Sequence, residues 1–249
     1  MLVSNINKFI FLRPYYSAST AVELMLSKSC QHKNDIITPI SFPEEIKRYK
    51  NNVFPKNYCS PKILELLYNL SVKFKNRSLI DRVLIKGKTL KLKNHDNLEK
   101  LLSEKEINHE EFKKISIVRH PYEKALSIAK RGLVEKNYLH LKKIKKPKEE
   151  EILENLNRIY LTKKINRINN WPIYSYKNKY IIDIMLKYET WPNLHVILRK
   201  HFKNLDTVKL KNLKSFGVKP INTDKIPRKV KKRIQKVCFE EFNHFSFKE

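Results

Sequence analysis

The stretch that decides the fold class is Ile115-Ser116-Ile117-Val118-Arg119-His120-Pro121-Tyr122-Glu123-Lys124-Ala125-Leu126-Ser127. Its apolar first four residues predict a buried β-strand, and Pro121 is favoured in the first turn of the helix that the following apolar spacing predicts. Arg119 therefore stands where the strand ends, and Ser127 lies almost two helical turns further on. A strand that leads at once into a helix is half of a βαβ unit. An arginine at this junction suits bidentate binding of a phosphate.

A second junction of the same kind is predicted at the N-terminus. Residues 8–13 (KFIFLR) form an apolar run that Pro14 ends, and residues 21–26 have the composition of a helix. The segment between them is Tyr15-Tyr16-Ser17-Ala18-Ser19-Thr20. Its main-chain N–H groups, the helix N-terminus and the hydroxyls of Ser17, Ser19 and Thr20 are suited to holding a phosphate. Since many strand-to-helix turns are polar, the spacing alone favours a structural turn.

The remaining pattern alternates strands with helices. Further strands are predicted over residues 35–40 and 181–186, with extended segments at 83–85 and 90–92. Helices are predicted after Pro43 and Pro61, after a cap at Asp96 or Asn97, and over 152–165, 193–201 and 227–242. This alternation predicts an α/β fold with a mostly parallel sheet flanked by helices. With no repeat and no clear linker, we expect one domain spanning residues 1–249.

The charge is strongly basic, with 53 lysines and arginines against 25 acidic residues and a net charge of +28. Such a field attracts nucleic acids, anionic membranes, nucleotides and acidic polysaccharides without distinguishing between them. No helix-turn-helix, zinc-finger or aromatic RNA-binding signature is present, so only charge favours a nucleic-acid-binding protein. A lysine-rich solvated surface also explains much of the excess.

The cysteines and apolar segments indicate a soluble intracellular protein. The three cysteines, Cys30, Cys59 and Cys238, are far apart, which predicts free thiols in a reducing compartment and no zinc site. No apolar run reaches the length of a membrane span, and residues 1–8 lack the order of a signal peptide. We therefore expect a cytoplasmic protein.

Both junctions resemble a known family. Residues 9–23 (FIFLRPYYSASTAVE) are similar to the 5'-phosphosulfate loop of carbohydrate sulfotransferases that use 3'-phosphoadenosine 5'-phosphosulfate (PAPS). Residues 117–127 (IVRHPYEKALS) resemble their 3'-phosphate segment, V-R-[NH]-P-[YW]-[DE] followed after three residues by serine. Asn94-His95 matches the Asn-His pair that precedes that segment. The resemblance is to bacterial-type members, related to Golgi glycan sulfotransferases, and covers most of the chain.

The resemblance implies a P-loop-like sulfotransferase fold, PAPS as cosubstrate, no metal, and a glycan as acceptor, with an acidic glycan as one option. It implies that Arg119 and Ser127 bind the 3'-phosphate and that His95 is the base that takes the proton of the acceptor hydroxyl. It does not imply a nucleic-acid partner. The predicted phosphosulfate-binding residues are Arg13, Tyr15, Tyr16, Ser17, Ala18, Ser19, Thr20 and Ala21.

Two positions depart from the family pattern. Tyr16 stands where members usually carry a lysine, and Ala21 replaces the final serine of the loop. Arg13 is the predicted substitute for the missing cation, and a lysine from elsewhere is the alternative. A PAPS- or glycan-binding relative without turnover is the other hypothesis that this departure leaves open.

Two further features have simpler explanations. Glu44 and Glu45 offer an alternative base, but acidic residues after Pro43 are favourable charges in the first turn of a helix. The segment Lys86-Gly87-Lys88-Thr89 ends like a Walker motif, but Arg82 occupies the place of the glycine that this motif needs. We therefore reject a nucleoside-triphosphatase.

Overall fold

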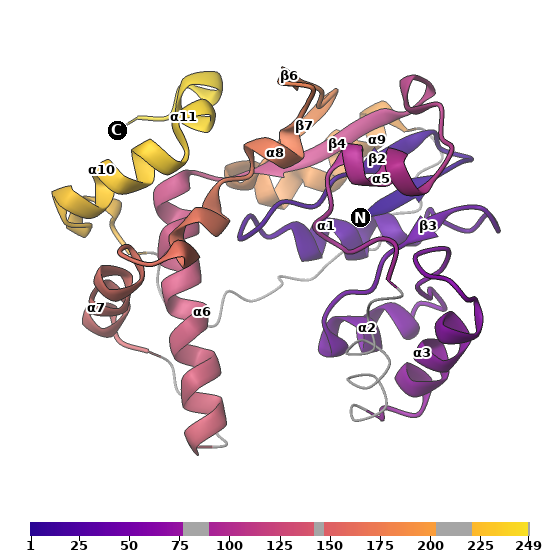
Figure 1. Cartoon of the computed structure of the whole chain (residues 1–249), viewed down its shortest axis with the longest axis horizontal. Coiled ribbons are helices and arrows are strands. Elements are labelled where there is room, and N and C mark those ends of the chain that lie inside the picture. The colour runs from indigo at the N-terminus through magenta and orange to yellow at the C-terminus, as the bar shows by residue number, and fades with distance from the viewer. Residues whose placement is uncertain (77–89, 142–146, 203–220, 249) are drawn as a thin grey trace. The chain divides into compact units, whose positions relative to one another are not determined.

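The computed structural model describes residues 1–76, 90–141, 147–202 and 221–248. The extended segment predicted at 83–85 and the segment Lys86–Thr89 lie outside these residues. The described residues fall into two compact units (Figure 1). The first takes its described residues from 1–14, 18–117 and 173–202, and the second takes them from 15–17, 118–172 and 221–248.

The first unit is built on a mixed sheet. Among the described residues, five strands follow the order β3-β1-β2-β4-β7, with β1 at Leu2–Ser4, β2 at Phe9–Phe11, β3 at Ile36–Ile37, β4 at Lys113–Val118 and β7 at Ile184–Lys187. β1 pairs antiparallel with both β2 and β3, whereas β2 and β4 are parallel. The α/β class is therefore confirmed. The expectation of a mostly parallel sheet holds only in part, because the unpredicted β1 forms an antiparallel hairpin with β2.

The strands β1, β2 and β3 are buried on both faces, which explains their nearly continuous apolar sequences. Phe9 and Phe11 belong to the same core cluster as Ile115 and Ile117, as the two-residue period of a strand requires. The intervening Ile10 is equally buried. The cluster also contains apolar residues of two helices, namely Val22, Met25 and Leu26 of α1 (Ser19–Ser27) and Leu194 and Leu198 of α9 (Leu194–His201).

The other elements of the first unit surround this core. Of the two predicted caps, Asp96 and Asn97, it is Asn97 that caps α5, since its side chain accepts a hydrogen bond from the Lys100 N–H at 3.0 Å. α2 and α3 pack on each other (Figure 1). The bounds are α2 Phe42–Tyr49, α3 Ile63–Lys73, α5 Leu98–Glu104, η2 His109–Glu111, β5 Ser175–Tyr176, β6 Lys179–Tyr180 and η4 Tyr188–Asn193.

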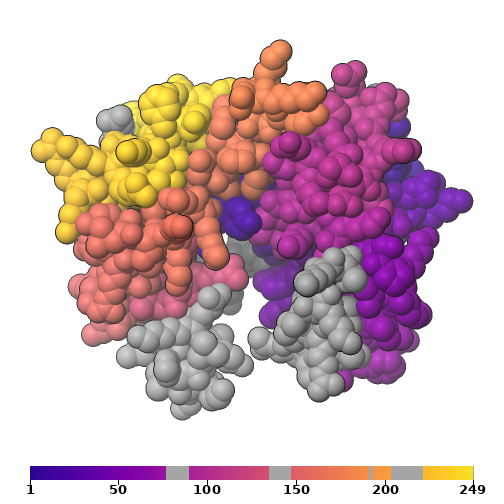
Figure 2. Space-filling view, in the orientation of Figure 1, coloured from indigo at the N-terminus to yellow at the C-terminus, as the bar shows by residue number. Residues whose placement is uncertain are grey.

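The second unit is helical. Pro121 begins its longest helix, α6 (Pro121–Leu141), which follows directly on β4 as predicted. The helix predicted over 227–242 is two helices, α10 (Arg228–Val237) and α11 (Phe239–Phe245), which meet at Cys238. α10 packs against η3. In Figure 2 the yellow C-terminal residues accordingly lie against salmon-coloured residues of the same unit. The remaining bounds are α7 Glu149–Ile159, η3 Lys163–Ile168 and η5 Thr223–Lys225, while α8 (Trp171–Tyr174) spans the boundary between the units.

The core of the second unit comes from the apolar stripes of these helices. All its members are buried. They include Tyr122, Ala125, Leu126 and Ala129 of α6, Ile152 and Leu156 of α7, Ile165 and Ile168 of η3, Val230 and Ile234 of α10, and Phe242 of α11.

Candidate functional site

The loop between β2 and α1 has a strained backbone. Tyr16 has φ 56° and Ala18 has φ 59°, so both adopt the left-handed conformation although neither is a glycine. Each such residue costs about 1–2 kcal/mol, because its Cβ approaches the following carbonyl oxygen. Strain of this kind persists only where the surroundings impose it, and it is found at ligand-binding turns. Turns with left-handed residues can direct successive N–H groups to one side and so bind anions.

The strand before this loop is fixed to its neighbour. The Leu12 N–H donates to the Ile115 carbonyl at 3.0 Å, and Ser116 Oγ donates to the Leu12 carbonyl at 2.8 Å. Ser116 is fully buried, so the second bond is shielded from water. The start of the loop is therefore set by β4, the strand that also carries Arg119 at its end.

The three predicted hydroxyls of the loop have different surroundings. Ser17 and Ser19 are buried and donate to carbonyls of the loop itself, Ser17 to Tyr15 at 3.0 Å and Ser19 to Pro14 at 2.6 Å. Thr20 is half-buried, and its hydroxyl accepts a hydrogen bond from Arg13 Nη2. Since a hydroxyl that accepts from a guanidinium keeps its own proton to donate, Thr20 is the hydroxyl best placed to serve an anion.

Ala21 is a buried residue of α1, 2% exposed. It lies in the first turn of that helix, three residues after the left-handed Ala18, whose carbonyl accepts from the Ala21 N–H at 3.0 Å. Its side chain is therefore part of the packing of the helix, and its N–H is used in the turn.

Arg13 belongs to a buried ion-pair network. Its Nη1 lies 3.0 Å from Oε2 of Glu23, and Arg48 Nη2 lies 3.0 Å from Oε1 of the same carboxylate. Arg48 also pairs with Glu45 at 3.0 Å. Burial alone would raise the pKa of the Glu23 carboxyl, but the charges of the Met1 amino group, Arg13 and Arg48 lower it below its ordinary value. Burial in turn lowers the pKa of Arg13, against the attraction of Glu23.

Glu45, one of the two alternative bases, is a structural member of this network. It is 1% exposed, and its Oε1 accepts both from Arg48 and from the Ile40 N–H, at 3.0 and 2.6 Å. Burial raises the pKa of Glu45, and the charge of Arg48 opposes that rise. A carboxylate held in this way is not available to take a proton from a substrate.

His95 lies beside the start of the loop in the first unit. Its Nδ1 is 3.0 Å from the Arg13 carbonyl. Because a carbonyl only accepts, Nδ1 carries the proton and Nε2 carries the lone pair, which is the tautomer that a general base needs. Burial, together with the charge of Arg13, lowers the pKa of His95 to about 3 from an ordinary value of 6.5. The imidazole is therefore neutral at physiological pH.

Arg119, the second predicted cation of the site after Arg13, lies in the second unit. Arg119 Nε lies 2.8 Å from Glu123 Oε2, and Arg119 Nη1 lies 3.5 Å from the carbonyl of Tyr16. Ser127 is half-buried and follows Glu123 by four residues on α6. Burial and the charge of Arg119 lower the pKa of Lys130. The structure thus brings Arg119 to the main chain of Tyr16, one of the two left-handed residues.

Sequence reasoning missed Asn170, which is fully buried and bonded to the loop. Its Oδ1 accepts from the Tyr15 N–H at 2.7 Å, and its Nδ2 donates to the Tyr15 carbonyl at 3.0 Å. The only available signal was the pair Asn169-Asn170 before Trp171-Pro172, which is typical of a turn.

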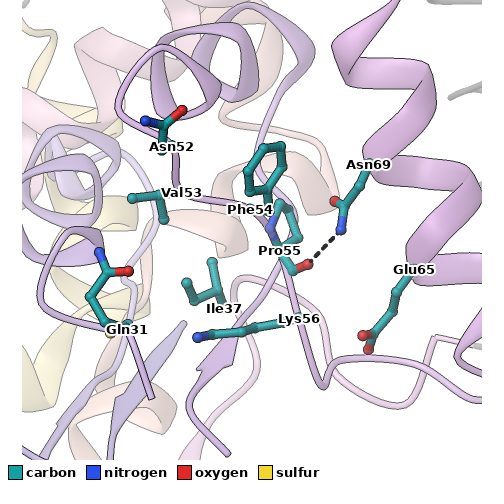
Figure 3. A pocket seen from close by; sticks show the side chains of 10 residues that line it. Gln31, Ile37, Asn52, Val53, Phe54, Pro55, Lys56, Glu65 and Asn69 are labelled. Carbon is teal, nitrogen blue, oxygen red and sulfur yellow. Dashed lines mark hydrogen bonds between the residues drawn. The ribbon is translucent and has the colours of Figure 1, made fainter. Parts of the chain in front are cut away.

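A small pocket in the first unit has a different lining (Figure 3). Its volume is about 170 Å³, and Ile37, Val53, Lys56, Glu65 and Asn69 are among the residues around it. Its polar groups hold the surrounding backbone. Lys56 donates to the His32 carbonyl at 2.7 Å, and Asn69 donates to the Pro55 carbonyl at 3.2 Å, the contact drawn in Figure 3. None of the predicted site residues lines this pocket.

The described residues hold neither a metal-ligating cluster nor a membrane-spanning helix. They contain no cluster of three or more histidine, cysteine or acidic side chains that could ligate a metal. None of their helices is long and apolar enough to cross a bilayer. The three cysteines are buried free thiols.

No protein-family model matches the chain, and neither the curated proteins nor the solved structures contain a match.

Proposed function

We propose that the protein is a PAPS-dependent sulfotransferase that moves a sulfuryl group to a carbohydrate hydroxyl. The observation that carries this proposal is the strained, glycine-free loop at Tyr15–Thr20 with the Arg119 guanidinium beside its Tyr16 carbonyl. Strained turns rich in N–H donors, combined with a planar cation, suit phosphate and sulfate groups. The resemblance of residues 9–23 and 117–127 to the two nucleotide-binding segments of carbohydrate sulfotransferases supports the same function, and a P-loop-like fold belongs to the proposal.

In this proposal the loop binds the 5'-phosphosulfate through main-chain N–H groups and the Thr20 hydroxyl. Arg119 and Ser127 bind the 3'-phosphate. Arg119 now pairs with Glu123, whose carboxylate is 37% exposed. Because this pair is partly open to solvent, its exchange for a phosphate costs less than the opening of a fully buried pair.

The proposed reaction is an in-line displacement at sulfur. The acceptor oxygen forms a bond to sulfur while the bond between sulfur and the bridging phosphate oxygen breaks, and the nucleotide leaves as 3'-phosphoadenosine 5'-phosphate (PAP). The acceptor's proton passes to Nε2 of His95. A base with a pKa of about 3 is weak, but the negative charge of a bound donor would raise the pKa of His95 and strengthen it as a base.

Arg13 acts in this proposal through Thr20. Its guanidinium is shared between Glu23 and the Thr20 hydroxyl, so it polarises the hydroxyl that would face the departing phosphate. The catalytic role predicted for Arg13 thus becomes a positioning role in the proposal, as the cation behind the loop, while Arg119 is the cation that contacts the ligand.

The proposal is tested first by PAP binding, measured by calorimetry, and then by transfer from labelled PAPS to a panel of neutral and acidic glycans. We expect binding and transfer by the unchanged protein. His95→Ala should keep PAP affinity within about threefold and lower turnover by about 100- to 10,000-fold, as expected for loss of a general base. Absence of PAP binding would overturn the proposal.

The same assays separate the alternatives. Normal PAP binding without transfer to any acceptor would point to a PAPS- or glycan-binding relative that lacks turnover. Steeply salt-dependent binding to DNA without PAP affinity would point to a nucleic-acid-binding protein, for which the +28 charge is the supporting observation.

A further inference from the structure

The side chain of Asn170 pairs with a peptide group as a neighbouring strand would. It meets both main-chain polar groups of Tyr15, accepting from the N–H at 2.7 Å and donating to the carbonyl at 3.0 Å. A third contact runs from Nδ2 to Ser17 Oγ at 3.5 Å. Two residues at the start of the strained loop are therefore attached to one buried amide that lies 155 residues along the chain from Tyr15.

Asn170 is itself held by a buried ion pair. Its N–H donates to Glu241 Oε1 at 2.7 Å, and Glu241 Oε2 lies 2.6 Å from Lys124 Nζ. Lys124 also donates to the Ile168 carbonyl at 2.6 Å. The side chains of Lys124 and Glu241 are both 0% exposed. Because a buried charge must stay paired, this arrangement resists displacement and holds the backbone that carries Asn170.

The loop needs an external constraint of this kind. Glycine adopts the left-handed conformation without penalty, but the two left-handed residues here are Tyr16 and Ala18. Nothing in their own chemistry favours that conformation, so surrounding contacts must impose it. Asn170 contacts the residues on either side of Tyr16, because its side chain forms hydrogen bonds with both Tyr15 and Ser17.

We propose that Asn170 is the positioning residue of the anion-binding loop, and that the buried Lys124–Glu241 pair keeps it in register. The identity of the anion as PAPS rests on the proposed function, but the positioning of the loop does not. Asn170 does not touch the reacting atoms in this assignment. Its effect on the reaction passes through the N–H groups of the loop.

The first experiment needs no ligand. Hydrogen–deuterium exchange is measured for the segment that contains Tyr15 in the unchanged protein and in Asn170→Asp. An aspartate can still accept from the Tyr15 N–H, but its second oxygen would face the Tyr15 carbonyl and repel it. We expect the loop amides of the variant to exchange about 10-fold faster or more, because the loop opens locally.

Asn155→Asp is the matched control. Asn155 lies in the same unit and donates to the Ala129 carbonyl at 2.7 Å, but none of its hydrogen bonds reaches the loop. The control should lose a comparable side-chain bond to a main-chain carbonyl while leaving exchange at Tyr15 unchanged. Equal exchange at Tyr15 in all three proteins, or equal acceleration in both variants, would overturn the proposal.

The second experiment measures PAP binding and the kinetics of transfer from PAPS. Asn170→Ala should raise the PAP dissociation constant and the KM for PAPS by about 10- to 100-fold, as expected when binding groups are misplaced. The KM for the acceptor and the exchange of core amides in β4 should stay the same, which a merely structural role would not predict. Unchanged PAP affinity in a variant whose loop exchanges fast would contradict the role in positioning. If the unchanged protein itself binds no PAP, the proposed function fails, and the exchange experiment alone decides the role of Asn170.

Discussion

Arg13 and Arg119 occupy equivalent places but have opposite surroundings. Each follows a strand of the same parallel pair, each precedes a helix, and each forms an ion pair with a glutamate, at 3.0 Å and 2.8 Å. Glu23 is fully buried, whereas the Glu123 side chain is 37% exposed. Pairs of similar length thus differ in energetics. Removing one member of a buried pair leaves an uncompensated buried charge, whereas opening a partly exposed pair does not. Arg13 belongs to a buried network, whereas the carboxylate that pairs with Arg119 is open to solvent.

The largest expected effect comes from removing the two glutamates separately. Glu23→Ala should lower the free energy of unfolding by about 3–5 kcal/mol, since Arg13 and Arg48 would remain buried without their shared carboxylate. Glu123→Ala should change it by about 1 kcal/mol or less. Urea unfolding monitored by circular dichroism measures both. Similar losses in the two variants would remove the distinction between the pairs.

The arginines themselves should separate binding from stability. Arg119→Gln should weaken PAP binding by about 100-fold, the loss of one or two charge-assisted hydrogen bonds, while unfolding changes by about 1 kcal/mol or less. Arg13→Gln should act mainly on stability, with a loss of about 3 kcal/mol. Calorimetry with PAP and urea unfolding are run on both variants. If Arg13→Gln is as stable as the unchanged protein, Arg13 is not part of the structural network.

The pH dependence of stability tests the surroundings of His95 next to Arg13. The folded pKa of about 3 lies below the ordinary value of 6.5, so the unfolded chain binds more protons between these values. The stability that the neutral imidazole contributes is present above pH 6.5 and is lost as pH falls toward 3, by at most about 1.4 kcal/mol per pH unit. His95→Gln should show a correspondingly shallower decline of the urea midpoint between pH 7 and 4. Parallel declines in the two proteins would mean that His95 is not desolvated by Arg13 and its surroundings.

The smallest effect is expected at the loop that follows Arg13. Ala18→Gly relieves a left-handed alanine but gives the unfolded chain more freedom, so the net stabilisation should be about 1 kcal/mol or less. Ala21→Gly, three residues later in α1, is the matched control and should destabilise by about 1 kcal/mol. Thermal unfolding shows whether each of the two variants is more or less stable than the unchanged protein. A destabilising Ala18→Gly would show that the backbone at this position is not strained.

Local sequence was sufficient to predict the elements that a clear apolar run, a proline or a capping residue marks. The apolar run before Arg119 predicted β4, Pro121 predicted the start of α6, and a cap at Asp96 or Asn97 predicted the start of α5. Turn chemistry and caps act over a few residues, so local sequence is enough for them. The strand β1 was missed. With three residues it is too short for any period to show, and it becomes a strand through pairing with β2 and β3.

In the candidate site, too, some residues could be predicted from the sequence and some contacts could not. The sequence predicted the loop residues, Arg119 and His95 as site residues, but it did not show that Glu23, a lone acid among apolar neighbours, belongs to a buried ion pair. That Arg13 would be its partner was not readable. Neither was Asn170, since an Asn-Asn pair before Trp-Pro is typical of a turn and its partner Tyr15 is remote in the sequence.

By itself, the sequence determined the α/β class, the two strand-to-helix junctions, and the placing of an arginine at each. These follow from hydrophobic period, proline and capping, which are properties of neighbouring residues. Only the tertiary structure decided that one arginine is buried with Glu23 while the other lies partly buried at Tyr16 and pairs with a partly exposed glutamate. It also decided that the sheet is mixed and that Asn170 holds the loop. Burial, ion pairing and strand direction depend on which distant residues meet, and that information lies in the folded chain.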